Sequence, residues 1–417
     1  MSEITLDEFR SEVVAFLEDH ASPRVVASDF VWGEGSDDVG LFEEQDPAAE
    51  LAEIVEAKAW RATRFDAGLG WIGGPAEFGG RGLGSAYERS YYSAEVKFET
   101  PNMSIFGISL GMVAPTILAH GTDLAKNAYL RDLYRGDLIA CQLFSEPGAG
   151  SDLAGLQTKA ERDGDEWILT GQKVWTSNAQ HADIGEIICR SDPDLPKHKG
   201  LTGFVVDMRA PGVEIRPLRQ MTGGATFNEV FFNEVRVPDT HRLGDVNQGW
   251  SVALTTLMNE RASIGSGSGS GLGLLSPQRL HAMLAHFDAD RDPVIRDEVA
   301  QVYIGFQVAK LNAQRGLDKI KAGQLPGPEM STGKLALTNN LRAYSELVAR
   351  VLGPRIIADT GEWGTYAWSK LLLGVPGMRV AGGTDEVMRN ILAERVLGLP
   401  KDPGIDSKTA FRDQLKN

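Results

Sequence analysis

Residues 141–153, CQLFSEPGAGSDL, carry the most information about the fold. An apolar run ends at Ser145, and Glu146 and Pro147 lead into a Gly-Ala-Gly-Ser turn. Glycines let the backbone approach a ligand closely, and successive N–H groups can bind a phosphate or a carbonyl oxygen. Taken alone, the stretch is either a ligand-binding turn or a plain surface turn.

The periodicity of the chain differs on the two sides of this stretch. Residues 1–135 are mostly of helical period, and Thr5 with Glu8 predicts a capping box at the first helix. From 136 to 243, short apolar segments alternate with turn residues, which is typical of a β-barrel or sandwich. The predicted strands span 166–170, 173–176, 184–190, 203–207, 212–215 and 230–237.

The helical period returns over residues 244–417. The predicted helices span 250–260, 297–322, 330–352 and 386–397. We therefore predict an α+β multidomain protein with an N-terminal helical domain (1–135), a middle β domain (136–243) and a C-terminal helical domain (244–417). Residues 264–273, IGSGSGSGLG, fit either a linker or a helix whose small residues allow close packing.

Composition and charge narrow the classes of function. The 417 residues carry a net charge of −15, which argues against nucleic acid or an anionic membrane as the main partner. A phosphorylated ligand stays compatible, because phosphates can bind to backbone N–H groups. Cys141 and Cys189 lie in apolar stretches and are expected to be buried thiols. The acidic N-terminus is unlike a secretory signal and no apolar run approaches about 20 residues, so we expect a cytoplasmic protein without a membrane span.

A tryptophan with two hydroxyl neighbours ends the predicted strand 173–176. The segment LTGQKVWTSNA (169–179) places Trp175 beside Thr176 and Ser177. A flat indole with adjacent hydroxyls can stack on a flavin ring and hydrogen-bond its edge. A core tryptophan is the alternative interpretation.

Two segments near the C-terminus offer further candidates. Glu260 and Arg261 follow an amphipathic pattern, so Glu260 is either a general base with a raised pKa or half of a solvated pair. Gly382 and Gly383 precede Thr384, which is expected to cap the last helix and can create an anion or carbonyl site. Phosphate-loop and metalloprotease motifs are missing, and the seven His residues show no metal-ligand spacing.

Together, and in this order, these segments resemble the acyl-CoA dehydrogenase family over nearly the whole chain. The matching segments are WIGGPAEFGGRG (71–82), LAHGTDLAKNAYL (118–130), CQLFSEPGAGSDL (141–153), GQKVWTSN (171–178), FFNEVRVP (231–238), the pair at 260–261 and GGTDEVMRNILAERVLG (382–398). The resemblance implies FAD as cofactor and an architecture of N-terminal helices, a middle β domain and a C-terminal four-helix bundle. It also implies a homotetramer, arranged as a dimer of dimers.

The resemblance implies positions for the flavin and for the CoA arm. The residues expected to bind FAD are Gln142, Leu143, Phe144, Ser145, Gly150, Ser151, Trp175, Thr176, Ser177, Thr384 and Glu386. Ser151 and Arg261 are expected to contact the substrate. The family's Arg-x-x-Phe-Gly motif, which contacts FAD of a neighbouring subunit, is missing, so Arg291 or Arg296 is expected to substitute, and the Gln-x-x-Gly-Gly motif is reduced to VLGPR (351–355).

The family places its catalytic base at one of two positions. Many members have a Glu just before the Gly-Thr of the final segment, and this position is Gly382 here. Other members place it on an earlier helix just before an Arg, which is Glu260 here. The resemblance therefore implies Glu260 as the base, with Asp385 and Glu386 as rivals. The N–H of Gly382 is still expected to bind the thioester oxygen.

The implied reaction is the dehydrogenation of an acyl-CoA to the trans-2-enoyl-CoA, as in fatty acid β-oxidation. Glu260 is expected to remove the α-proton while the β-hydrogen passes to FAD as hydride, and an electron-transfer flavoprotein is the expected acceptor. Two alternatives stay open: an acyl-CoA oxidase or flavin monooxygenase on the same fold, and a partner-dependent subunit of a mixed tetramer. Straight, branched and steroid-side-chain esters are all compatible with the sequence.

Overall fold

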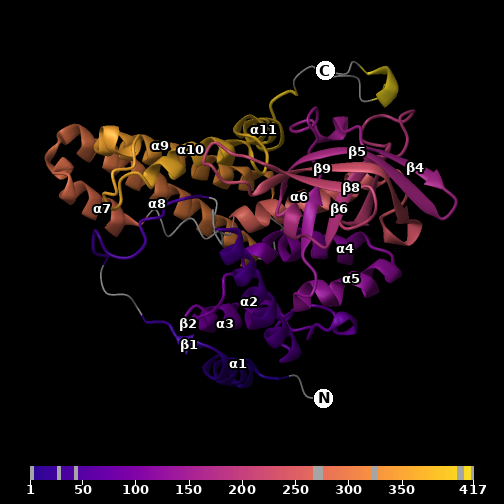
Figure 1. The fold of residues 1–417 in the computed structure, drawn as a ribbon, viewed down its shortest axis with the longest axis horizontal. Helices are drawn as coiled ribbons and strands as arrows, with labels where there is room; N and C mark the ends of the chain where they lie inside the picture. Colours follow the sequence, from indigo (N-terminus) through magenta and orange to yellow (C-terminus); the bar gives the residue numbers. More distant parts are fainter. Residues whose placement is uncertain are drawn as a thin grey trace.

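The computed structural model describes residues 4–25, 30–41, 46–265, 276–321, 327–401 and 408–414. Figure 1 shows N-terminal helices, a β-sheet and a C-terminal group of helices as three spatially distinct parts. The predicted α+β organisation is confirmed, with the three parts in the predicted order along the chain. Among the described helices, none is both long and apolar enough to cross a membrane.

The N-terminal part begins with the predicted capping box. The Thr5 hydroxyl accepts a hydrogen bond from the Glu8 N–H at 3.3 Å, and the Thr5 N–H donates to the Glu8 carboxylate at 2.8 Å. This caps α1 (Leu6–His20), whose apolar face packs on α3 (Ser85–Glu95). The remaining elements here are α2 (Pro47–Asp66), α4 (Ala114–His120), α5 (Asp123–Arg135) and the short pair β1 (Ser22–Pro23) and β2 (Phe98–Glu99).

The middle part is one sheet, whose strands surround a core that contains both cysteines. Its strands are β3 (Ala140–Leu143), β4 (Lys159–Asp163), β5 (Glu166–Ser177), β6 (Ile184–Arg190), β7 (Leu201–Asp207), β8 (Val213–Leu218), β9 (Phe227–Pro238) and β10 (Arg242–Leu243). They follow the order β10-β7-β6-β4-β5-β9-β8, and β3 joins β6 in parallel. Cys141 and Cys189 are buried free thiols, as predicted.

The prediction of two strands over 166–176 is wrong, because β5 is continuous. Its pairing with β9 shifts register near Gly171 and again between Lys173 and Thr176. A side chain at Gly171 would lie 2.5 Å from the hydroxyl oxygen of Thr158, the residue just before β4. The close approach of Thr158 to β5 therefore requires a glycine at position 171. Local sequence therefore indicates a break where pairing with the neighbouring strand maintains the element.

The C-terminal part consists of α6 (Gly249–Gly265), α7 (Pro277–His286), α8 (Pro293–Lys321), α9 (Ser331–Leu352), α10 (Trp368–Val380) and α11 (Asp385–Ile391). Helices α7 and α10 were not predicted, and Pro376 inside α10 is a residue that normally ends a helix. Helix α6 continues to Gly265, beyond the predicted end. Residues 266–273 of the glycine–serine stretch lie outside the described residues.

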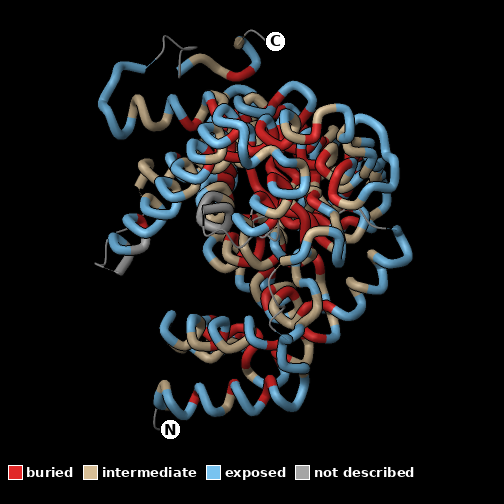
Figure 2. Tube along the Cα trace, turned by 90° about the vertical axis from the view of Figure 1, so that its left-hand side faces the viewer, coloured by how far each residue is buried: buried red, intermediate tan, exposed pale blue. Residues whose placement is uncertain are grey.

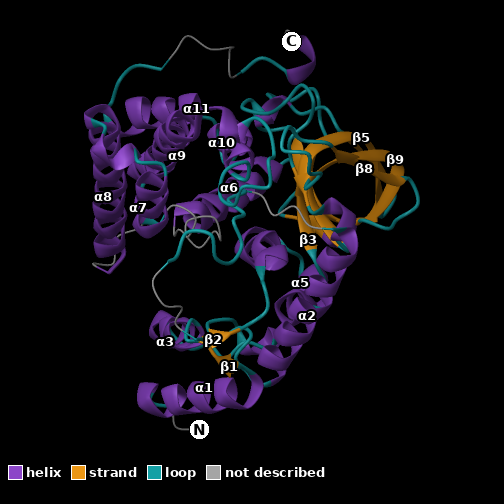
Figure 3. Cartoon of the chain, turned by 60° about the vertical axis from the view of Figure 1, so that its left-hand side comes forward, coloured by secondary structure: helices purple, strands orange, loops and turns teal. Residues whose placement is uncertain are grey.

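Helix α6 joins the sheet to the C-terminal helices (Figure 3). Val252 and Ala253 share a core with Ile188 of β6 and Val205 of β7. Farther along, α6 contacts α4 and α9. Figure 2 shows the buried residues concentrated around the sheet and the helices that cover it. The position of α6 is therefore set by the sheet on one side and by helices on the other.

Candidate functional site

The glycine-rich turn after β3 is held in place by a buried ion pair. Lys173 of β5 is fully buried, and its ammonium lies 2.9 Å from the Glu146 carboxylate. The same ammonium donates to the carbonyl oxygens of Phe144 at 3.1 Å and Ile188 at 2.8 Å. One cation thus connects the turn, β5 and β6.

The Glu146 carboxylate fixes the far side of the turn. It accepts hydrogen bonds from the N–H groups of Gln157 at 2.6 Å and Thr158 at 2.9 Å. Burial raises the pKa of Glu146, but Lys173 and these donors outweigh burial and lower the pKa below its usual range. The carboxylate is therefore charged, and its hydrogen bonds connect the backbone before residues 147–151 to the backbone after them.

The predicted flavin-binding residues of the first segment lie at the end of β3. Leu143 and Phe144 are buried, whereas Gln142 and Ser145 are half-buried. The Val174 N–H donates to the Ser145 carbonyl oxygen at 2.9 Å, which brings this segment against β5. Gly150 and Ser151 are exposed, and a side chain at Gly150 would meet nothing within 4 Å. Packing within the chain therefore does not require a glycine there, and space is left for a ligand.

Trp175 and Thr176 match a flavin better than they match a protein core. The core interpretation of Trp175 is wrong, because the residue is 60% exposed and has a left-handed backbone with φ of 60°. Such a conformation is costly for a bulky residue and is concentrated at functional sites. The Thr176 hydroxyl is buried without a hydrogen-bond partner in the described part of the chain, while Ser177 is half-buried. An exposed indole beside an unpaired hydroxyl suits the edge and face of a flavin ring.

Glu260 lies on α6 and is half-buried. Thr256, one turn earlier on the same helix face, is buried against the sheet. The Glu260 side chain is thus held near the junction of sheet and helices. Arg261 follows in α6, and its side chain lies outside the described part of the structure.

The loop before α11 has the conformation that two glycines allow. Gly382 and Gly383 have φ values of 65° and 91°. Thr384 then caps α11 as predicted, with its hydroxyl accepting from the Val387 N–H at 3.1 Å. Glu386 on the first turn is exposed and lies 3.5 Å from Arg389.

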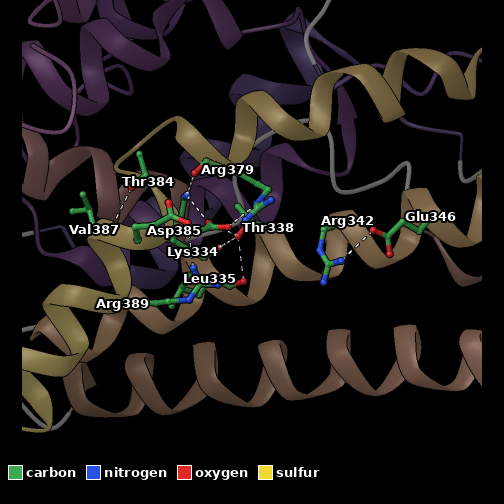
Figure 4. A network of polar contacts seen from close by, with 11 residues as sticks. Lys334, Leu335, Thr338, Arg342, Glu346, Arg379, Thr384, Asp385, Val387 and Arg389 are labelled. Carbon is green, nitrogen blue, oxygen red and sulfur yellow. Dashed lines mark hydrogen bonds and ion pairs between the residues drawn. The ribbon is translucent and has the colours of Figure 1, made fainter. Parts of the chain in front are cut away.

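Asp385 is the anchor of this loop (Figure 4). Its buried carboxylate accepts hydrogen bonds from Lys334 at 3.1 Å, Thr338 at 2.8 Å and Arg379 at 2.8 Å. Burial raises the pKa of Asp385, but these donors reverse the effect and lower it to about 2. A carboxylate that is so acidic and so fully bonded is a poor proton acceptor, which weakens Asp385 as a rival to Glu260.

One predicted residue lies apart from the others within the chain. Arg291 is exposed in the short turn between α7 and α8. Helix α7 lies at the end of the C-terminal helices that is distant from the sheet (Figure 1). Within one chain, Arg291 is therefore not brought together with β3 and β5.

Comparison with known proteins agrees with this geometry. Models of the N-terminal, middle and C-terminal domains of acyl-CoA dehydrogenase match residues 40–137, 141–235 and 247–397. The chain belongs to the acyl-CoA dehydrogenase family. It is therefore a member of an oxidoreductase family, as predicted.

Several relatives share most of this chain. The acyl-CoA dehydrogenase IpdE1 of Mycobacterium tuberculosis is 34% identical, over 95% of this chain and 98% of the relative. FadE34 from the same organism is 39% identical over 85% of this chain, which spans about half of that relative's length (48%). Among solved structures, a variant of the Tcur3481–Tcur3483 steroid ACAD is 25% identical, with a TM-score of 0.69 over 95% of this chain and 99% of that one. The ChsE4–ChsE5 complex of M. tuberculosis is also 25% identical, with a TM-score of 0.67 over 96% of this chain and 100% of that one.

Sequence reasoning missed the charged residues that organise the site from within. Glu186 and Lys334 lie in segments that were interpreted only by their apolar periodicity, and Lys173 lies in a segment that was interpreted through Trp175 and its hydroxyl neighbours. The available signal was a charged residue inside an apolar strand pattern, as in KVW (173–175) and GEIIC (185–189). Such a residue needs a buried partner.

Breaking the buried ion pair tests its role in the turn. Lys173→Met leaves the Glu146 charge buried without its cation, so we expect a loss of about 3–5 kcal/mol in the free energy of unfolding. The double variant Lys173→Met/Glu146→Gln removes both charges and should recover part of this loss. Urea unfolding of the two variants measures the difference. Equal destabilisation in both would contradict a coupled pair.

The low pKa of Asp385 predicts a dependence of stability on acid. The unfolded side chain has a pKa of about 3.9, so the native carboxylate contributes stability above pH 4 that is lost as the pH falls toward 2. The contribution is about 2–3 kcal/mol. Asp385→Asn should lower stability at pH 6 and flatten the pH dependence between 4 and 2 in thermal unfolding. An unchanged profile would sink this assignment.

Proposed function

We propose that this chain is a FAD-dependent acyl-CoA dehydrogenase that forms a trans double bond between the α- and β-carbons of a CoA thioester. The observation that carries the proposal is the end of β5, where an exposed, left-handed Trp175 adjoins Thr176, whose buried hydroxyl has no hydrogen-bond partner among the described residues. Ser145, just before the turn at 147–151, accepts a hydrogen bond from Val174, the residue before Trp175. FAD, when bound, supplies the acceptor for the β-hydrogen.

The chain's own residues divide the binding work between cofactor and substrate. Gln142 to Ser145 would support the flavin from β3, and Trp175, Thr176 and Ser177 from the end of β5. Gly150 and Ser151 occupy the exposed part of the turn, where the CoA arm or the diphosphate of FAD can approach the backbone N–H groups. Thr384 and Glu386 lie at the N-terminus of α11, whose partial positive charge also favours a phosphate or carbonyl oxygen.

Glu260 is the proposed base. Glu260 is half-buried on α6, one turn after the buried Thr256, and its carboxylate can serve as a general base. Gly382 keeps a backbone N–H in a left-handed loop, which can stabilise the negative charge that develops on the thioester oxygen. Arg261 is the next residue along α6 and therefore lies in the same C-terminal part of this helix as Glu260. Electron transfer from the reduced enzyme to an electron-transfer flavoprotein completes the proposal.

The relatives suggest a substrate class. One solved structure of similar fold is described as a steroid ACAD. We therefore place CoA esters of steroids or of steroid side chains first among the candidates, ahead of straight and short branched chains.

The exposed apolar surface of helix α8 supports the proposal that this chain assembles with further subunits. Ile304, Val308 and Leu311 lie one turn apart on one face of α8 and are 50–66% exposed in the single chain. A contiguous apolar stripe on a surface helix is typical of a subunit contact. Two structural neighbours are described by pairs of chains, Tcur3481–Tcur3483 and ChsE4–ChsE5. We propose a tetramer that this stripe helps to form, made of identical chains or of this chain with a partner.

Anaerobic titration of the purified protein with a panel of acyl-CoA esters tests the proposed function. Loss of flavin absorbance with one class of ester is the expected result and identifies the substrate class. A protein that carries FAD but is reduced by none of the steroid, straight or branched esters would contradict the reaction. A colourless protein would favour the partner-dependent subunit instead.

The assignment of the base predicts the effect of one substitution. Glu260→Gln removes the proton acceptor but keeps the size of the side chain, so flavin reduction should slow by at least about a hundredfold. FAD content and binding of the ester should change little. Stopped-flow reduction measures the rate, and Glu386→Gln is the matched control. Slow reduction in the control with normal reduction in Glu260→Gln would reverse the assignment.

The stripe on α8 predicts a change of assembly. The double variant Ile304→Asp/Leu311→Asp places two charges in the proposed contact, so the assembly should dissociate because buried unpaired charges are costly. Light scattering after size exclusion gives the mass. Leu51→Asp, at an exposed leucine of α2, is the control and should keep the native mass. A double variant of native mass would exclude this face.

A further inference from the structure

A buried carboxyl group connects the sheet to the helix that carries Glu260. Glu186 lies on β6 with no exposed surface. The Thr256 hydroxyl of α6 donates to one oxygen of this carboxyl at 2.6 Å. Thr256 in turn lies 2.9 Å from the hydroxyl of Thr116 on α4. All three side chains are fully buried, and we refer to them as the Glu186 chain.

Two members of the Glu186 chain, Glu186 and Thr256, adjoin residues of the proposed reaction site. Gln142 of β3 is the register partner of Glu186, so the two side chains lie on the same face of parallel neighbouring strands. Thr256 precedes Glu260 by four residues, so both occupy one face of α6. The hydrogen bond from Thr256 to Glu186 therefore lies between the proposed flavin strand and the proposed base.

The surroundings of Glu186 favour its protonated form. Its second carboxyl oxygen is buried with no hydrogen-bond partner among the described residues, and a charged carboxylate would leave that oxygen at high cost. Burial is the largest effect on this group and raises the pKa of Glu186 to about 8, against a smaller opposing effect of Thr256. The other titratable groups on the packed elements are Cys141 on β3, His120 on α4, Glu260 and Arg261 on α6, Cys189 and Arg190 on β6 and Asp207 on β7.

We propose that Glu186 is a positioning residue of the reaction, which as a neutral acid holds the base helix α6 in register with the flavin-binding strand β3. The proposal rests on the proposed function above. A neutral acid can bond to Thr256 without placing a second negative charge near Glu260. A side chain unable to bond would leave the buried Thr256 hydroxyl without its acceptor on β6, and α6 would lose this polar contact with the sheet.

Two substitutions at position 186 separate the effects of charge and of hydrogen bonding. Glu186→Gln keeps the size and the hydrogen bond but cannot ionise, whereas Glu186→Leu removes the bond. We expect Glu186→Gln to reduce its flavin at the wild-type rate near pH 7. We expect Glu186→Leu to bind FAD and to reduce it about tenfold to a hundredfold more slowly, because small misplacements of a catalytic group have effects of this size. Thr256→Val should behave like Glu186→Leu.

The pH profile provides a readout that a merely structural role would not change. Glu186 ionises as the pH rises through about 8, so the wild-type rate should fall above that pH. In the window between the unfolded pKa of a glutamate and about 8, the native state keeps a proton that the unfolded state has lost, so the stability of the folded state falls as the pH rises through this window. Glu186→Gln should lack both effects. A fall in the Glu186→Gln rate that matches wild type would overturn the proposal.

Hydrogen exchange of α6 tests the positioning without using the reaction. In Glu186→Leu, the amides of residues 252–260 should exchange at least about tenfold faster than in Glu186→Gln, because the helix has lost its polar contact with β6. Equal exchange in the two variants, with equal flavin reduction, would refute the role of Glu186. If none of the tested esters reduces the flavin of the wild-type protein, the proposed function fails. The exchange comparison then still decides whether Glu186 holds α6.

Discussion

The buried Lys173–Glu146 ion pair is the constraint on which the rest of the site depends. An unpaired charge in this interior would be too costly to keep, so the two residues must meet, and their meeting fixes the path of the backbone between β3 and β4. The Lys173 ammonium also donates to the carbonyl oxygen of Phe144, just after β3, and to that of Ile188 on β6. Within the turn at 147–151 only Ala149 is buried, and Gly148 and Gly150 are left exposed for a ligand.

Helix α6 connects the sheet to the proposed base, Glu260. Apolar residues such as Val252 attach it to the sheet, while the Glu186 chain adds a polar contact with a defined partner and direction. Hydrophobic packing resists removal of the helix but is tolerant of small shifts, whereas a buried hydrogen bond fails if the helix rotates. Apolar packing together with this buried hydrogen bond suits a helix that has to hold the Glu260 carboxylate in one position. On the other side, Asp385 holds the Gly382–Gly383 loop through three donors.

Much of this architecture could be predicted from the sequence, because local rules and global packing agree in most elements. The capping box at Thr5, the strand period over 184–190 and the cap at Thr384 are short-range signals that the structure confirms. The family resemblance indicated the candidate residues, and the structure brings the β3 and β5 segments together. The exposure of Trp175 could not be inferred, since it follows from a left-handed residue within a register shift of β5.

What the sequence could not indicate are contacts between distant charged or polar residues. Lys173 and Glu146 are separated by a whole strand and turn, and Glu186 meets Thr256 across 70 residues. A periodicity pattern identifies each of these residues only as a polar residue within an apolar segment, and it does not indicate which distant residue the side chain contacts. Helix α10 was missed because Pro376 lies within it, where burial of Trp368 and Leu371 outweighs the local cost of the proline.

The position of the base is the central claim, and a crystal structure of the FAD-loaded protein with a non-reactive acyl-CoA analogue, in which sulfur replaces the β-carbon and the thioester is kept, tests it most directly. We predict a carboxylate oxygen of Glu260 within about 3–3.5 Å of the α-carbon, with the Gly382 N–H directed at the thioester oxygen. A different carboxylate at that carbon, from this chain or from a partner subunit, would contradict the claim.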